Sequence, residues 1–174
     1  MKNLLALSIF LSFSFLIYNG CQQQEERTYT DSEVQQMMNM STKLWNGGDI
    51  ELVSNLYSEN CVRHNADLGV AKGPAEIKKF VKWVYTAYPD FKVTFDEPMK
   101  FKDRIINVFK ASATNDGPLG ENMPATGNKM SFNGMAMSKI ENGKIIEEWV
   151  YYNSLPIYTQ LGFKLVPVEE EVKK

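Results

Sequence analysis

The sequence predicts an α+β domain in which N-terminal helices pack on one face of a curved antiparallel sheet. Apolar residues recur at helical spacing as far as residue 89, and from residue 90 onward they alternate with polar residues. Asn142-Gly143 is a strong signal for a two-residue hairpin between two long strands. Helices that precede a run of antiparallel strands are typical of the α+β class.

Length and composition limit the classes of protein. The chain has 174 residues, of which 44% are hydrophobic and 23% are charged, as expected for one globular domain. One histidine and two cysteines exclude a multi-histidine metal site, a four-cysteine zinc site and a disulfide framework, so we expect no metal and no cofactor. The net charge of −2 offers no basic excess for a phosphate backbone, so we expect no nucleic-acid partner.

The N-terminus has the pattern of an export signal. Lys2 precedes 15 uncharged residues, Leu4 to Tyr18, which are too few for a bilayer span but fit the apolar region of a signal peptide. Cys21 follows Gly20 and precedes a polar run, which resembles a bacterial lipobox, although Tyr18 stands where leucine is usual. We expect lipidation at Cys21, with a plain secretory signal or an uncleaved anchor as the alternatives.

These signals divide the chain into four parts. We expect a signal peptide over residues 1–20, a polar tether over 21–29, the folded domain over 30–165 and a charged tail over 166–174. The predicted localisation is the bacterial envelope, in the periplasm or at the outer membrane, with the lipid on Cys21 as the membrane anchor. Cys61 is then the remaining thiol, and its strand-like surroundings predict a small buried hydrophobe.

Three helices are predicted before residue 89. The first begins at a capping box, Thr30–Glu33, and ends at Gly47-Gly48. Asp49 is expected to cap a short second helix. The third begins at Gly73-Pro74, where proline is tolerated in the first turn, and Pro89 ends it.

The remaining elements are predicted to be strands, apart from one short helix after Pro156 that ends at Gly162. A Gly/Pro-rich loop over residues 115–128 matches no phosphate-binding pattern, so we expect a lid or a strand connection there. The predicted strands are Cys61–Asn65, Phe91–Phe95, Arg104–Thr114, Lys129–Ile140 and Lys144–Asn153.

The predicted hairpin register determines which side chains share a face. A two-residue loop pairs Glu141 with Lys144, Ala136 with Trp149 and Phe132 with Asn153. Strand alternation then places Glu147, Trp149, Tyr151 and Asn153 on the face that also carries Phe132. Both faces carry large apolar residues and the helices cover one of them, so we predict a homodimer through the other.

Several stretches in order over about residues 33–163 resemble the SnoaL-like polyketide cyclase, or ester cyclase, family of the nuclear-transport-factor-two-like superfamily. These stretches are Trp45-Asn46-Gly47-Gly48-Asp49, Val62-Arg63-His64-Asn65, Gly73-Pro74-Ala75-Glu76-Ile77, Tyr88-Pro89-Asp90, Ala113-Thr114-Asn115-Asp116-Gly117, Pro124-Ala125-Thr126-Gly127, Asn142-Gly143-Lys144-Ile145-Ile146-Glu147-Glu148-Trp149 and Gln160-Leu161-Gly162. The resemblance implies a cone-shaped α+β barrel whose curved sheet wraps a pocket roofed by helices, and it implies dimers.

The same resemblance implies two departures in chemistry. In the cyclases an aspartate four residues after the strand tryptophan is the pocket acid or base, and here that position is Asn153. A histidine often follows the threonine of the glycine loop, and here that position is Asn115. A carboxamide does not titrate and can only hold an oxygen by donation, so the usual cyclase mechanism does not carry over to Asn153.

Four other polar residues are candidates for the site. His64 has the right pKa range for acid–base work, and its alternative is a hydrogen-bonded structural role. Asp90 is either a pocket base or the cap of a turn. Glu147 is either a partly buried acid or a member of a salt bridge. Asn107, within an apolar strand, either orients a ligand or faces solvent.

Aromatic residues are the second kind of candidate. Trp149, Tyr151, Phe132, Trp83 and Tyr88 are predicted either to form a wall around an apolar ligand or to belong to the core. The leading hypothesis is an envelope lipoprotein whose domain binds a small, mostly apolar molecule in an aromatic-lined pocket. The alternative is a cyclase or isomerase acting on a small carbonyl or ester compound, with His64 or Asp90 as acid or base. A structural role with a vestigial pocket is the third hypothesis.

Overall fold

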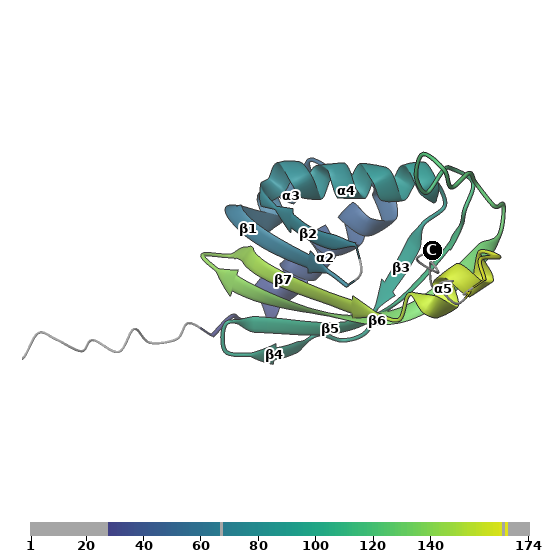
Figure 1. The fold of residues 1–174 in the computed structure, drawn as a ribbon. Coiled ribbons are helices and arrows are strands. Elements are labelled where there is room, and N and C mark those ends of the chain that lie inside the picture. Colours follow the sequence, from purple (N-terminus) through teal and green to yellow (C-terminus); the bar gives the residue numbers. More distant parts are fainter. Residues whose placement is uncertain (1–27, 67, 165, 167–174) are drawn as a thin grey trace, which may run out of the picture.

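Helices lie on one side of a curved sheet in the computed structural model, which describes residues 28–66, 68–164 and 166 (Figure 1). The helices are α2 (Asp31–Gly47), α3 (Leu52–Leu56), α4 (Gly73–Ala87) and α5 (Leu155–Gln160). The strands are β1 (Tyr57–Asn65), β2 (Gly69–Lys72), β3 (Lys92–Phe95), β4 (Met99–Phe101), β5 (Arg104–Thr114), β6 (Lys129–Glu141) and β7 (Lys144–Tyr152).

The predicted signal peptide, Cys21, most of the tether and nearly all of the charged tail lie outside the described residues. None of the helices within residues 28–66, 68–164 and 166 is both long and apolar enough to cross a membrane. The export and lipidation assignments therefore stay predictions from the sequence.

The strands form one sheet in the order β2-β1-β7-β6-β5-β3, with β4 pairing β5 beyond the end of β3. The long strands β5, β6 and β7 form the predicted antiparallel meander. We call the face covered by α2 and α4 the inner face and the opposite one the outer face, and α5 lies at the end of the sheet where β7 stops (Figure 1). This arrangement, helices packed on a curved and unclosed sheet, confirms the predicted α+β class.

The direction of one strand pair differs from the prediction. The extended segment around Cys61–Asn65 is β1, as expected, but β1 pairs with β7 in parallel, so the predicted antiparallel pairing is wrong for these two strands. The strands β2 and β4 are only four and three residues long and were not predicted, because so short a segment shows no clear alternation. Parallel partners are far apart in sequence, which is why no local pattern reveals them.

Most helix ends follow the predicted signals. The capping box is present, since Thr30 accepts a hydrogen bond from the Glu33 amide and the Glu33 carboxylate accepts one from the Thr30 amide. Gly48 ends α2 in the left-handed conformation with a φ of 65°. The predicted Asp49 cap of α3 is wrong, because that helix begins at Leu52 without a side-chain cap and Asp49 accepts from the Glu51 amide in the preceding turn.

A single bulge changes the register of the β6–β7 hairpin. The turn is as predicted, since Asn142 and Gly143 both have positive φ values, 50° and 75°, and Glu141 pairs with Lys144. The pairing then shifts by one residue after Ile140, which leaves Ile146 as the extra residue of the bulge.

The bulge exchanges the faces of β7. Ala136 pairs with Val150 rather than Trp149, and the last pair is Gly134 with Tyr152, so the predicted pairing of Phe132 with Asn153 is also wrong. Side chains alternate between the two faces of a sheet, so one extra residue puts every side chain after the bulge on the opposite face. Glu148, Val150 and Tyr152 therefore face inward, whereas Glu147, Trp149 and Tyr151 face outward.

Candidate functional site

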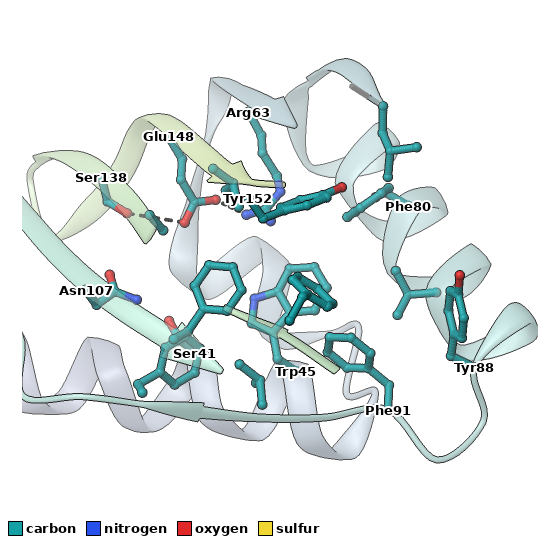
Figure 2. Close-up of a pocket in the computed structure, with 18 of the residues that line it drawn as sticks. Ser41, Trp45, Arg63, Phe80, Tyr88, Phe91, Asn107, Ser138, Glu148 and Tyr152 are labelled. Carbon is teal, nitrogen blue, oxygen red and sulfur yellow. Dashed lines mark hydrogen bonds and ion pairs between the residues drawn. The ribbon is translucent and has the colours of Figure 1, made fainter. Parts of the chain in front are cut away.

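A cavity of about 210 Å³ lies between the inner face of the sheet and the helices (Figure 2). Strands β5, β6 and β7 supply one wall, and α2 and α4 supply the other. Aromatic rings dominate the lining, which includes Trp45, Phe80, Trp83, Tyr88, Phe91, Phe95, Phe109, Phe132, Tyr152 and Tyr158. The interior beneath the helices is therefore hollow and largely apolar.

One end of the cavity is polar. The Glu148 carboxylate forms an ion pair with Nη1 of Arg63 and accepts hydrogen bonds from the Tyr57 hydroxyl at 2.8 Å and the Ser138 hydroxyl at 3.2 Å. Arg63 also donates through Nε to the side chain of Asn65 at 2.7 Å. All five residues are buried, so this network sits in a low-dielectric environment, where ionic hydrogen bonds are strong and unpaired charges are costly.

Burial and the neighbouring charges shift the pKa values of Tyr57 and Arg63. Burial, together with the adjacent Glu148 carboxylate, raises the pKa of Tyr57 well above its usual value, so this phenol is a neutral donor. Burial alone would lower the pKa of Arg63, but the negative charge of Glu148 outweighs it and raises that pKa. Arg63 is therefore protonated, and its positive charge lies against the carboxylate of Glu148.

The guanidinium of Arg63, at the polar end of the cavity, also contacts aromatic rings of the cavity wall. The Cζ atom of Arg63 lies 4.9 Å from the ring centroid of Trp45 and 5.7 Å from that of Phe80. Contacts of a cation with a ring face are favourable at such distances. Figure 2 shows Arg63 and Glu148 on one side of the cavity and the ring of Tyr88 at the far end of it.

Four of the predicted ligand-binding residues line the cavity, namely Trp83, Tyr88, Asn107 and Phe132. The Trp83 indole donates to the carbonyl of Leu119 at 3.2 Å and so ties α4 to the loop between β5 and β6. Burial, with a smaller effect of Tyr158, raises the pKa of Tyr88 to about 12, so its hydroxyl is neutral. Trp83, Tyr88 and Phe132 serve both as wall and as core, because each packs in the same apolar cluster.

Four other candidates lie on the outer face: Glu147, Trp149 and Tyr151 because of the bulge in β7, and His64 on the neighbouring strand β1. His64 contacts Glu147 through Nε2 at 3.0 Å and stacks on Trp149 with a ring-centroid separation of 5.5 Å. Tyr151 is 57% exposed on the same face. None of the four is among the described residues that line the cavity. Their face is where the predicted homodimer would form, and that dimer stays a prediction.

Asn153 and Asp90 are also placed outside the cavity lining. Asn153 is exposed, and its carbonyl oxygen accepts from the Leu155 amide at 3.2 Å in the turn before α5. Asp90 is exposed and accepts from the amide and the hydroxyl of Thr114 at 2.6 and 2.7 Å. The Asn153 contact stabilises a turn, whereas the Asp90 contacts join the segment after α4 to Thr114 at the end of β5.

The Asp90 contacts predict a pH dependence of stability. Hydrogen bonds from the amide and then the hydroxyl of Thr114 hold the pKa of Asp90 below its usual value. A carboxylate with a lowered pKa stabilises the fold above its unfolded pKa of about 3.9, and the contribution is lost as the pH falls through the folded pKa. We expect the stability difference between the wild type and Asp90→Asn to shrink from pH 5 towards pH 2. Urea unfolding at several pH values measures this difference, and a constant difference would contradict the assignment.

The sequence analysis missed Arg63, Glu148 and Ser138 as site residues. Arg63 and Glu148 each sit one position from a residue that was considered, and strand alternation makes that single position decisive. The available signal was a charged residue within a predicted strand, as at Arg63 between Val62 and His64, and this signal does not say which face is inside.

The fold and the cavity define a class of small α+β domain, in which helices and a curved, unclosed sheet enclose an aromatic-lined space. The model of the SnoaL-like polyketide cyclase family matches residues 35–161, and the chain belongs to this family. None of the curated proteins matches.

Solved structures share the fold at low identity. TsrD from Streptomyces laurentii is 22% identical with a TM-score of 0.69, covering 77% of this chain and 98% of its own. AclR from Streptomyces galilaeus is 22% identical with a TM-score of 0.66, covering 76% and 98%. IdmH from Streptomyces antibioticus is 20% identical with a TM-score of 0.62, covering 74% and 98%.

Proposed function

We propose that the domain binds a small, mostly apolar molecule inside the cavity. The supporting observation is the hollow, aromatic-lined interior of about 210 Å³. An apolar cavity of about 150 Å³ is large enough to bind benzene, so this one has room for a larger ring compound. Ligand sites are typically concave and apolar with a few polar groups, as here.

The arrangement favours binding over the alternative cyclase or isomerase activity. That alternative relied on His64 or Asp90 as acid or base, and neither is among the described lining residues. The charged residues of the described lining are Arg63 and Glu148, and they are paired with each other. The carboxylate of the described lining is Glu148, and its two oxygens already accept hydrogen bonds from Tyr57 and Ser138.

Binding is tested with naphthalene and a variant that fills the cavity. Ala136 is buried and faces the cavity, so Ala136→Phe is expected to weaken naphthalene binding at least about tenfold by occupying the space. Met135→Phe is the matched control, because the neighbouring side chain is exposed on the outer face. Isothermal titration calorimetry measures both affinities, with circular dichroism to verify folding. Equal affinity in the two variants would exclude the cavity as the site.

We also propose that the protein is an exported lipoprotein of the bacterial envelope. The support is the apolar segment Leu4 to Tyr18 followed by the lipobox-like Cys21. Cys21→Ser is expected to move the protein from the membrane fraction to the soluble fraction of its own cells. Cys61→Ser is the control, because that thiol is buried and 1% exposed in the core. Unchanged partitioning of Cys21→Ser would disprove lipid anchoring.

A further inference from the structure

Asn107 presents an unpaired carboxamide to the cavity. Asn107 is only 7% exposed, and no described residue forms a hydrogen bond with its side chain. Within the described part of the chain, no fully enclosed side-chain nitrogen or oxygen lacks a partner, so the Asn107 carboxamide must open onto the cavity space. Buried amides are nearly always hydrogen-bonded, because leaving one unpaired costs free energy. The missing partner is what a bound molecule would supply.

Other polar groups lie at the same end. Ser41 on α2 lines the cavity, and its hydroxyl has no hydrogen bond with a described residue. The hydrogen bonds of Arg63 use Nε and Nη1, which leaves the hydrogens of Nη2 for a further acceptor. Figure 2 shows Asn107, Ser41 and Ser138 at one end of the cavity, with the ring-lined region beyond them.

The charge balance of this end indicates which head group fits. Arg63 and Glu148 are the charged residues of the described lining, and they neutralise each other. A ligand carboxylate or ammonium would therefore bring an uncompensated charge into a low-dielectric space, which is costly. An uncharged oxygen adds no such charge. It can accept from the Asn107 amide, while a hydroxyl can also donate to the Asn107 carbonyl.

We infer that the cavity selects an uncharged ring compound with a carbonyl or hydroxyl oxygen at one end, and that Asn107 is the residue that recognises this oxygen. This inference rests on the proposed function, and it adds the charge and polar group of the ligand. The apolar body of the ligand lies against the rings of the cavity, and its oxygen lies between β5 and α2, which carry Asn107 and Ser41.

Three probes that share the naphthalene ring test the inference, namely naphthalene itself and the nearly isosteric 2-acetylnaphthalene and 2-naphthoate. With the wild-type protein, we expect 2-acetylnaphthalene to bind about tenfold more tightly than naphthalene, because it satisfies the buried amide. We expect 2-naphthoate to bind more weakly than the ketone by at least about tenfold, because of its unpaired charge. Calorimetric titration at pH 7.5 gives all three affinities.

Variants of Asn107 then assign the recognition to this residue. Asn107→Leu is expected to lose the preference for the ketone, so that its affinities for 2-acetylnaphthalene and naphthalene differ by less than about threefold. Asn107→Ala repeats the test without the added branch, and thermal unfolding verifies that both variants fold. Val108→Leu is the matched control on the outer face and is expected to keep the preference.

The outcomes separate this inference from the proposal on which it depends. No binding of naphthalene by the wild type would overturn the proposed function and the inference together. Binding of naphthalene with no preference for the ketone, or a preference that survives in both Asn107 variants, would overturn only the role of Asn107. Tighter binding of 2-naphthoate than of the ketone would show that the polar end recognises an anion, and it would overturn the assigned ligand class.

Discussion

Arg63→Met is expected to lower the free energy of unfolding by about 3–5 kcal/mol, because it leaves the buried Glu148 carboxylate without its cation. The remaining hydrogen bonds from Tyr57 and Ser138 are neutral and do not replace the lost charge. The methionine also loses the stacking of the guanidinium on Trp45. Urea unfolding at pH 7, followed by circular dichroism, measures the change.

The matched experiment removes both charges. In Arg63→Met/Glu148→Leu no buried charge is left unpaired, so we expect the double variant to recover most of the stability lost in Arg63→Met. The double-mutant cycle then gives the coupling energy of the pair. A double variant no more stable than the single one would mean that shape and hydrogen bonding, rather than charge pairing, determine the cost. A loss below about 1 kcal/mol for Arg63→Met, as for exposed ion pairs, would contradict the burial of the pair.

Gly117→Ala is expected to destabilise the fold by about 3 kcal/mol, at the upper end of the range for overpacking. A Cβ atom at Gly117 would lie 1.9 Å from the backbone oxygen of Thr86, so one of the two chain segments must move. This position docks the loop after β5 on the end of α4, since the Gly117 amide donates to the Ala87 carbonyl at 3.2 Å. The Asn115 side chain donates to the same carbonyl at 3.1 Å.

Gly120→Ala is the control in the same loop. Its Cβ would lie 3.5 Å from the end of the flexible Met123 side chain, an ordinary contact, so we expect a change within about 0.5 kcal/mol. Thermal and urea unfolding of both variants compare the two positions directly. Similar stabilities of Gly117→Ala and Gly120→Ala would mean that the loop is not packed closely against α4.

The predictions from local pattern were accurate for single elements. The capping box of α2, the span of α4 and the exact bounds of β5 depend on short stretches of sequence, and local side-chain and backbone preferences decide them. The Asn142-Gly143 turn is equally local, since both positions need a positive φ. Asn115 illustrates the limit, because its buried carboxamide joins α4 to the loop, a role that no neighbouring residue indicates.

The site was predicted less well than the fold. Trp83, Tyr88, Asn107 and Phe132 were named as candidates and line the cavity, although for Asn107 the sequence left a solvent-facing position open. The outward placement of Glu147, Trp149 and Tyr151, and the inward placement of Glu148, follow from the extra residue at Ile146. A bulge costs little locally and is selected by packing between distant strands, so the hairpin sequence alone did not reveal it.

By itself, the sequence determined the class of fold, the order of helices and long strands, the turn at Asn142-Gly143 and the resemblance to the family. These features depend on residues close in the chain or on the order of short motifs. Only the tertiary structure decided which face of β7 is inside, that β1 runs parallel to β7, and that Arg63 and Glu148 meet at one end of a cavity. Arg63 and Glu148, for example, are 85 positions apart, and the geometry of such contacts depends on how the whole sheet packs under the helices.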